Sequence, residues 1–135
     1  MSDRPVVLYA SVHNSGRSVA AKVLTEHYAG DRIEMRFAGS EPGRGINPMV
    51  AQALAERGLS TAAETPKKLD TDSVQASDVV ITMGCGETCP YFPGKRYEDW
   101  VIDDPAGQDI DMVRRIVGDV DARVRKLVDE LVTAD

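Results

Sequence analysis

The sequence predicts an α/β fold in which a parallel sheet is covered by helices on both of its faces. Two short apolar runs, Val6–Ala10 and residues 79–83, have the composition of buried parallel strands. Segments with helical spacing alternate with the strands, in the order βαβαβ, then β, then α. This alternation is typical of parallel strands joined by crossover helices.

The first half of the chain supplies two strands and two helices. A helix follows the loop after Val6–Ala10 and ends at Ala29–Gly30, because glycine is favoured just beyond the last turn of a helix. Residues Arg32–Ala38 alternate between apolar and charged side chains, which predicts a strand near an edge of the sheet. A second helix begins at Asn47–Pro48, a capping residue followed by proline, and runs to Arg57.

The second half begins with a short helix over Thr71–Ala76, followed by the strand at residues 79–83. A loop with two cysteines then leads to a short last strand, Tyr97–Ile102. From Ile110 onward the apolar residues recur at helical spacing and predict a long helix. These apolar residues are Val113, Ile116, Val117, Val120, Val124, Leu127 and Leu131.

Size and charge limit the class of protein. A chain of 135 residues is expected to form one domain over residues 1–135. Its net charge of −6 argues against nucleic acid or an anionic membrane as the main partner. The chain starts without a signal-peptide pattern and has no apolar stretch long enough for a membrane span, so we expect a cytoplasmic protein. In that compartment Cys85 and Cys89 are expected to be thiols.

Three loops follow predicted strands, at residues 11–17, 84–94 and 103–107, and we expect them to converge on one edge of the sheet. The first loop combines Gly16 for a sharp turn, the fixed cation of Arg17 and a helix start at Ser18. Successive N–H groups at a helix start form a nest for an anion, and arginine grips two of its oxygens. The alternative is a polar turn with an incidental arginine. We predict an oxyanion site formed by Val12, His13, Asn14, Ser15, Gly16, Arg17 and Ser18.

Four segments together resemble one enzyme superfamily. The loop SVHNSGRS at residues 11–18 resembles the C-x5-R-S phosphate loop of low-molecular-weight protein tyrosine phosphatases and the related arsenate reductases. The segments MGCGETCP at 83–90, PGKRYEDW at 93–100 and DDPAG at 103–107 resemble the arsenate reductase branch, of the actinobacterial type linked to thioredoxin or mycothiol. The resemblance covers about residues 5–132 and implies a four-stranded parallel sheet flanked by helices.

The resemblance implies an arsenate reductase, an enzyme of arsenic detoxification that converts arsenate to arsenite. Position 11 would be the nucleophile, Arg17 would bind the arsenate oxygens and Ser18 would stabilise a thiolate at position 11. Asp104, which precedes Pro105, would protonate the leaving oxygen. Cys85 and Cys89 match the region of the resolving cysteines, with thioredoxin, or mycothiol with mycoredoxin, as the reductant.

Arsenate is favoured over phosphotyrosine as the substrate, with phosphate or sulfate as mimics. Pro105 is followed by Ala106–Gly107, where the phosphatase branch has aromatic residues that sandwich a phenyl ring. The two cysteines are superfluous to a phosphatase, whereas reduction of arsenate needs two electrons from thiols. The alternatives are a low-molecular-weight protein tyrosine phosphatase, and a non-catalytic homologue that binds an oxyanion or holds trivalent arsenic on Cys85 and Cys89.

The chain departs from the family at Ser11, where the family has cysteine. A serine hydroxyl is too weak an acid to replace a thiolate, so the Ser11 form is expected to be inactive or strongly impaired. We interpret Ser11 as an engineered replacement made to trap a bound state; the alternative is a natural homologue without the thiol. No cofactor and no metal are expected, because two cysteines with His13 and His27 do not complete a zinc site. Lys22 stands where some relatives have a glutamate that binds potassium.

Overall fold

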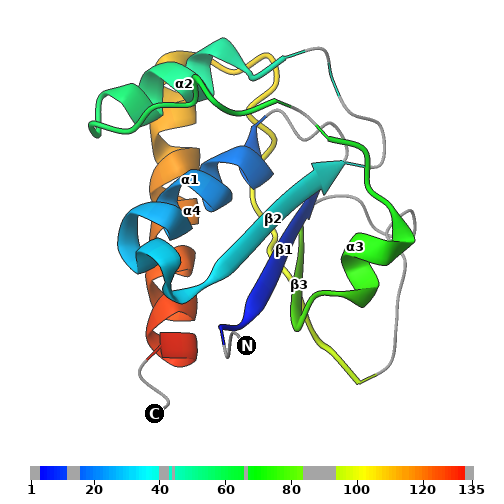
Figure 1. Cartoon of the computed structure of the whole chain (residues 1–135). Helices are drawn as coiled ribbons and strands as arrows, with labels where there is room; N and C mark the ends of the chain where they lie inside the picture. The colour runs from blue at the N-terminus through cyan, green and yellow to red at the C-terminus, as the bar shows by residue number, and fades with distance from the viewer. Residues whose placement is uncertain are drawn as a thin grey trace.

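Four parallel strands form the sheet, in the spatial order β2-β1-β3-β4 (Figure 1). The structure is a computed structural model and describes residues 4–11, 16–39, 43, 45–65, 67–83 and 94–132. The inner strand β1 pairs Ser11 with Gly39 of β2 and with Met83 of β3, so three strands end side by side at one rim. The strands are Val6–Ser11 (β1), Glu34–Gly39 (β2), Val79–Met83 (β3) and Arg96–Asp99 (β4).

Helices cover both faces of the sheet, which confirms the predicted α/β architecture (Figure 1). On one face lie α1 (Arg17–Ala29), α2 (Pro48–Ala55) and α4 (Ile110–Val132). The short helix α3 (Thr71–Gln75) lies on the other face. A 3₁₀ turn, η1 (Gly30–Arg32), connects α1 to β2.

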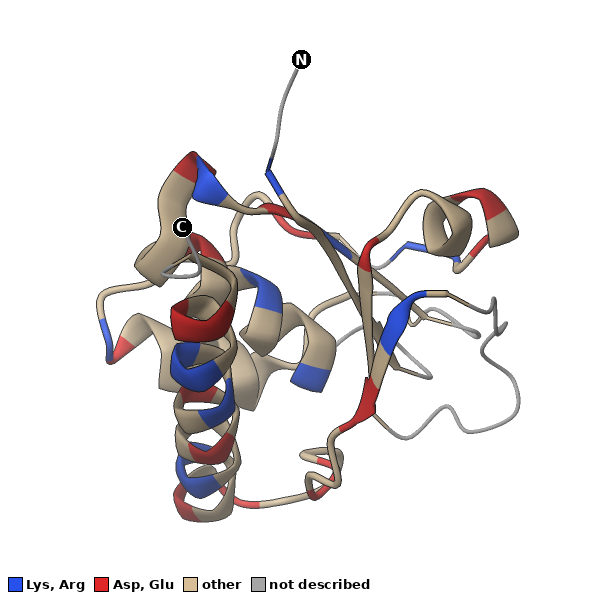
Figure 2. Ribbon diagram, turned by 90° about the horizontal axis from the view of Figure 1, so that it is seen from below, with Lys and Arg blue, Asp and Glu red and all other residues tan. Residues whose placement is uncertain are grey.

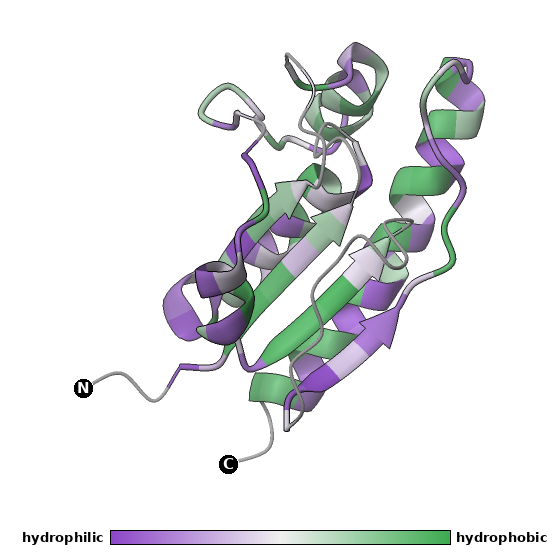
Figure 3. Ribbon diagram, turned by 90° about the vertical axis from the view of Figure 1, so that its right-hand side faces the viewer, coloured by the Kyte–Doolittle hydropathy of each residue, from purple (hydrophilic) through white to green (hydrophobic). Residues whose placement is uncertain are grey.

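The two faces of the sheet bury different residues, because alternate side chains of a strand point to opposite sides. From β1, Val7 and Tyr9 pack into the larger core with α1, α2 and α4, whereas Leu8 packs with Val74 of α3 in a smaller core. The strands β1 and β3 are therefore apolar along much of their length, whereas the edge strand β4 is hydrophilic (Figure 3). The helical periodicity predicted for α4 is confirmed by its buried residues, which are Val113, Ile116, Val117, Val120, Val124 and Leu127.

Tyr9 lies at the centre of the larger core. Its hydroxyl forms a 2.6 Å hydrogen bond with Thr25 of α1, and its ring centroid lies 5.8 Å from that of the buried Trp100. Burial raises the pKa of the Tyr9 phenol above its usual range, since water no longer stabilises the phenolate; the bond from Thr25 acts in the opposite direction and is outweighed. The phenol is thus held in its protonated form.

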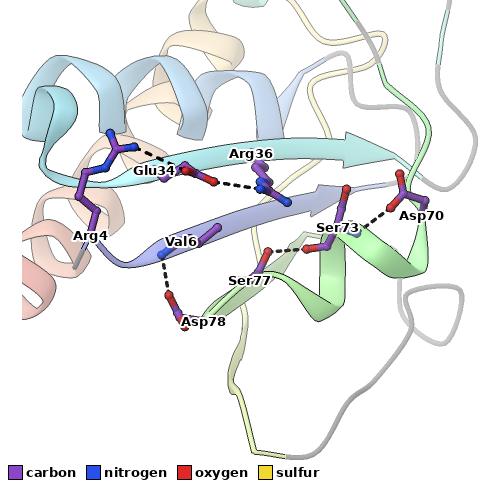
Figure 4. Close-up of polar contacts among 8 residues, drawn as sticks. All are labelled: Arg4, Val6, Glu34, Arg36, Asp70, Ser73, Ser77 and Asp78. Atoms are coloured by element: carbon purple, nitrogen blue, oxygen red, sulfur yellow. Dashed lines mark hydrogen bonds and ion pairs between the residues drawn. The ribbon is translucent and has the colours of Figure 1, made fainter. Parts of the chain in front are cut away.

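Polar contacts fix the ends of the elements on the α3 side of the sheet (Figure 4). The N–H of Ser73 donates to Asp70 at 2.6 Å, which caps the first turn of α3, and the hydroxyl of Ser77 donates to the carbonyl of Ser73 at 2.7 Å. Asp78 accepts the N–H of Val6 at 2.8 Å, which links the beginning of β3 to the beginning of β1.

Two predicted elements have different ends in the structure. The strand expected over Arg32–Ala38 begins at Glu34, because Arg32 is the last residue of η1. The helix expected to reach Arg57 ends at Ala55. There the N–H groups of Arg57 and Gly58 donate to carbonyls only three residues back, and the chain leaves the helix through a positive φ of 80° at Gly58.

The strand expected over Tyr97–Ile102 is β4, which begins and ends earlier. Pairing continues to the N–H of Trp100, which donates to the carbonyl of Thr82 at 2.9 Å. Beyond it Val101 is 80% exposed, while Ile102 is buried again. The chain thus turns away from the sheet edge before the segment that contains Asp104.

Charged residues lie along α4, the longest helix, in a mixture of both signs (Figure 2). Because of these charged residues, α4 is not apolar around its whole circumference. Within the part of the chain that the structure describes, no helix has the length and apolar character needed to cross a membrane.

Candidate active site

The candidate site begins where β1 ends, at Ser11. Its side chain is 4% exposed, and its hydroxyl oxygen lies 2.9 Å from that of Ser18 in the first turn of α1. Ser18 is fully buried. The strand and the helix therefore place two hydroxyl groups in contact, although Ser11 and Ser18 stand seven residues apart in the sequence. This contact agrees with the predicted neighbourhood of position 11 and Ser18.

The beginning of α1 is suited to a negative charge. No acidic side chain occupies the first turn, and Gly16 at the N-cap position has no side chain to accept the first N–H groups. The N-terminus of a helix carries unpaired N–H donors and a partial positive charge. An oxyanion placed over Ser11 would therefore meet the partial positive charge of a helix start whose first turn contains no acidic side chain.

Arg17 is the first residue of this helix, and its side chain contacts two residues of the segment between β4 and α4. Its Nη1 donates to the carbonyl of Ile102 at 2.8 Å, and its Nη2 lies 4.0 Å from a carboxylate oxygen of Asp104. The Arg17 side chain is 13% exposed, whereas that of Asp104 is 58% exposed. The cation is thus fixed in direction, and the carboxylate remains in contact with water.

Asp104 is oriented by its own turn. The other carboxylate oxygen accepts the N–H of Ala106 at 3.0 Å, and the carbonyl of Pro105 accepts the N–H of Gln108 at 3.1 Å. An aspartate that binds the backbone two residues ahead forms a local turn that restricts its side chain. The turn leaves Oδ2 of Asp104 on the side of Arg17.

The structure thus brings together Ser11, Gly16, Arg17, Ser18 and Asp104 at the carboxyl ends of β1 and β4. This confirms that the loops after these two strands meet. The remaining predicted site residues lie outside the described residues, and with them the loop at 84–94: they are Val12, His13, Asn14, Ser15, Cys85 and Cys89. Among the residues that are described, no group of three His, Cys, Asp or Glu side chains is arranged to hold a metal ion.

The structure adds a second reason for glycine at position 16, beside the sharp turn that the sequence predicts there. The φ of Gly16 is −135°, which lies outside the left-handed region that favours glycine. The constraint is space: a Cβ on Gly16 would lie 2.7 Å from Cγ of Pro105. Glycine is required here because another part of the chain approaches it closely.

Two contacts near the site were not predicted. The carbonyl of Ile102 holds Arg17, and a backbone acceptor leaves no trace in the residue type. Lys22, one turn further along α1, donates to Glu64 at 2.9 Å and to Glu26 at 3.2 Å. Burial lowers the pKa of Lys22, but the hydrogen bonds and charges of these glutamates outweigh it and raise the pKa above its usual value. The ammonium group is therefore charged and tethers α1 to the segment around residue 64.

Comparison with known proteins places this geometry in a family. The sequence pattern of low molecular weight phosphotyrosine protein phosphatases matches residues 6–135. A thioredoxin-dependent arsenate reductase of Corynebacterium glutamicum is 43% identical with a TM-score of 0.88; the match covers 99% of this chain and 65% of that one. An arsenate reductase of Archaeoglobus fulgidus is 33% identical with a TM-score of 0.75, over 90% of this chain and 98% of that one.

A curated relative agrees with these two structures. Arsenate reductase 1 of Bacillus cereus is 31% identical in an alignment of 131 positions that covers 93% of this chain and 96% of the relative. The family match over residues 6–135 includes β1, the beginning of α1 and the Asp104 turn, the elements that form the site. This chain belongs to the low molecular weight phosphotyrosine protein phosphatase family.

Proposed function

We propose that this chain is a thiol-dependent arsenate reductase, or the Ser11 form of one. The observation that carries the proposal is the fixed Arg17 at the beginning of α1, which lies beside Asp104 and directly precedes Ser18, the residue in contact with Ser11. A donor-rich helix start with a guanidinium fork fits a tetrahedral oxyanion. The relatives that are 31–43% identical and are named arsenate reductases supply the choice of oxyanion.

In the proposed reaction, position 11 carries a cysteine thiolate that attacks arsenic. The Ser18 hydroxyl, 2.9 Å from the side-chain oxygen of Ser11, stabilises that thiolate, and the helix start lowers its pKa. Arg17 binds two arsenate oxygens, and Asp104 gives a proton to the oxygen that leaves as water. The product of this step is an arsenic–sulfur adduct at position 11.

The second step moves the electrons. A second thiol attacks the sulfur of the adduct, a disulfide forms, and the electron pair of the sulfur–arsenic bond stays on arsenic, which leaves as arsenite. Two thiols are oxidised and arsenic gains two electrons, so the balance closes. We propose Cys85 or Cys89 as the internal candidates for the second thiol, with mycothiol as the external alternative.

The disulfide must then be reduced by a further thiol system. The Corynebacterium relative is named thioredoxin-dependent, and a Synechocystis relative, 28% identical over 125 residues, is named a glutaredoxin arsenate reductase. Both names support a small thiol-redox protein as the partner. Thioredoxin is our first choice, and mycothiol with mycoredoxin is the second.

Phosphatase activity is the second candidate function, because phosphate and arsenate have the same shape and charge. The segment after Asp104 argues against phosphotyrosine as the main substrate. Ala106 and Gly107 are both exposed and offer no ring to stack on a phenyl group. Arsenate needs no such wall.

The test compares the chain with its Ser11→Cys variant in arsenate turnover, coupled either to thioredoxin or to mycothiol with mycoredoxin. We expect arsenite from the cysteine variant only, since serine gives no thiolate. Cys85→Ser and Cys89→Ser, each combined with Ser11→Cys, distinguish the two candidates for the internal second thiol. The cysteine whose replacement abolishes arsenite release without added thiol is that second thiol. Binding of arsenate without turnover by Ser11→Cys would contradict the proposal in favour of a binding module. Faster hydrolysis of para-nitrophenyl phosphate than reduction of arsenate would favour the phosphatase.

A further inference from the structure

Gly16 and Pro105 touch across 89 positions of the sequence. A Cβ on Gly16 would lie 2.7 Å from Cγ of Pro105, 3.6 Å from its Cδ and 3.7 Å from a methyl group of Val50. A Cβ atom essentially never lies within 3.0 Å of a heavy atom outside its own residue and its two chain neighbours. Pro105 is buried, so its ring is enclosed against the first turn of α1. The contact leaves room for a hydrogen atom on Gly16 and for nothing larger.

The neighbouring residue holds the other end of the same segment. Arg17 donates to the carbonyl of Ile102 at 2.8 Å. Residues 102–105 are thus attached to α1 at both ends, by a hydrogen bond at Ile102 and by close packing at Pro105. Asp104 lies between these two attachment points, with Oδ2 4.0 Å from Arg17.

We propose that Gly16 is a positioning residue for Asp104. The absence of a side chain lets Pro105 rest directly on the beginning of α1, and this contact sets the distance between the Asp104 carboxylate and an oxyanion bound over position 11. The inference rests on the proposed role of Asp104 as the proton donor, and it adds a residue that acts only through that donor. Replacement of Gly16 by alanine leaves the backbone N–H of residue 16 in place.

The size of the expected displacement follows from the contact. An ordinary van der Waals contact needs 3.4 Å or more, whereas a Cβ on residue 16 would lie 2.7 Å from Cγ of Pro105. A methyl group on residue 16 is therefore expected to push Pro105 away by about 0.7 Å. Misplacement of a reacting group by about 1 Å costs on the order of 10²-fold in rate. The peptide N–H groups of α1 stay where they are, so oxyanion affinity is preserved.

The kinetic test uses the Ser11→Cys chain as its reference. Gly16→Ala is expected to slow the arsenate-dependent first step by about 10- to 100-fold in single turnover. Sulfate affinity, measured by calorimetry in the Ser11 chain, is expected to stay close to that of the parent. Gly118→Ala is the matched control, because it adds the same methyl group where the nearest atom, on Arg57, is at an ordinary 3.7 Å. An unchanged rate for Gly16→Ala would overturn the proposal.

Two double variants separate positioning from a general loss of structure. Pro105→Ala removes the ring that the new methyl group meets, so Gly16→Ala with Pro105→Ala is expected to be faster than Gly16→Ala alone. In an Asp104→Asn background the proton donor is already lost, so Gly16→Ala is expected to add little further slowing. A double variant no faster than Gly16→Ala, or full additivity with Asp104→Asn, would contradict the proposal.

A crystal structure of the Gly16→Ala variant in the Ser11 chain tests the contact without any turnover. We expect residues 103–105 to move away from α1 while Arg17 remains at the helix start. If the Ser11→Cys reference fails to reduce arsenate, the proposed function fails, and this structure still decides whether Gly16 positions the segment. An Asp104 turn that stays in its parent position would overturn the inference, even with an active enzyme.

Discussion

The Arg17→Lys variant distinguishes the effect of the planar guanidinium group at position 17 from the effect of its positive charge. Lysine keeps the positive charge but replaces a planar fork of donors with one flexible ammonium group. In the structure Arg17 uses Nη1 on the carbonyl of Ile102 and directs Nη2 toward Asp104. A lysine at this position has to choose between the backbone carbonyl and the oxyanion, so one of the two interactions is lost.

The magnitude follows from the contact that is lost. A hydrogen bond that involves a charged group contributes about 1.5–3 kcal/mol to a partly buried site, and Arg17 is 13% exposed. Since about 1.4 kcal/mol corresponds to a tenfold change in affinity, we expect oxyanion binding to weaken by about 10- to 150-fold. A residue that supplies only charge would lose much less on conversion to lysine.

The assay is calorimetric titration of the Ser11 chain with arsenate and with sulfate, because serine at position 11 prevents covalent chemistry from distorting the binding curve. Arg115→Lys is the matched control, since Arg115 is an exposed arginine of α4. Equal affinities for the parent and Arg17→Lys would refute the assignment of Arg17 as the oxyanion fork. Weaker binding in the Arg115→Lys control would show that the loss is not specific to position 17, because this exchange also leaves the net charge unchanged.

Three further predictions concern stability, each measured by urea denaturation. Above pH 10 the free energy of unfolding of the parent should fall about 1.4 kcal/mol per pH unit more steeply than that of Tyr9→Phe, because burial raises the pKa of Tyr9 in the folded state. The protonated phenol stabilises the fold fully below pH 10, and this stabilisation is lost as the pH rises. Parallel curves for the two proteins would contradict the prediction. Glu64→Gln should lower the free energy of unfolding by about 1–3 kcal/mol, because it leaves the half-buried ammonium of Lys22 with a weaker partner. Glu26→Gln, which changes the exposed partner of Lys22, should lower it less, and equal losses would refute this ranking. Gly118→Ala should stabilise α4 by up to about 1 kcal/mol, since the methyl group meets only an ordinary contact at 3.7 Å; a net loss of stability would show that the position is too crowded.

The strands and the long helix could be predicted because burial constrains their composition. β1 and β3 are covered on both faces, so their apolar runs stand out in the sequence, and α4 shows its one apolar side as a period of 3.6 residues. The ends of β4 could not be predicted in this way. They depend on where pairing with β3 stops, at the N–H of Trp100, and a backbone hydrogen bond is not encoded in the residue that makes it.

The same distinction applies to the candidate site. Topology predicts that loops after parallel strands meet, and Arg17 does lie beside Asp104. The sequence does not tell that Arg17 is anchored on the carbonyl of Ile102, or that Pro105 approaches Gly16 too closely for a side chain. Such close approaches between distant segments are properties of the folded chain.

Trp100 gives the protein its own optical probe. It is the single tryptophan of the sequence, it is buried beside Tyr9, and it stands at the end of β4, four residues before Asp104. Its indole N–H donates to Glu98 at 3.1 Å, so the emission of the ring depends on a nearby charge as well as on its shielding from water. If the Asp104 turn moves when an oxyanion is mixed with the protein, we expect the intrinsic fluorescence of Trp100 to report the movement in real time and without a label.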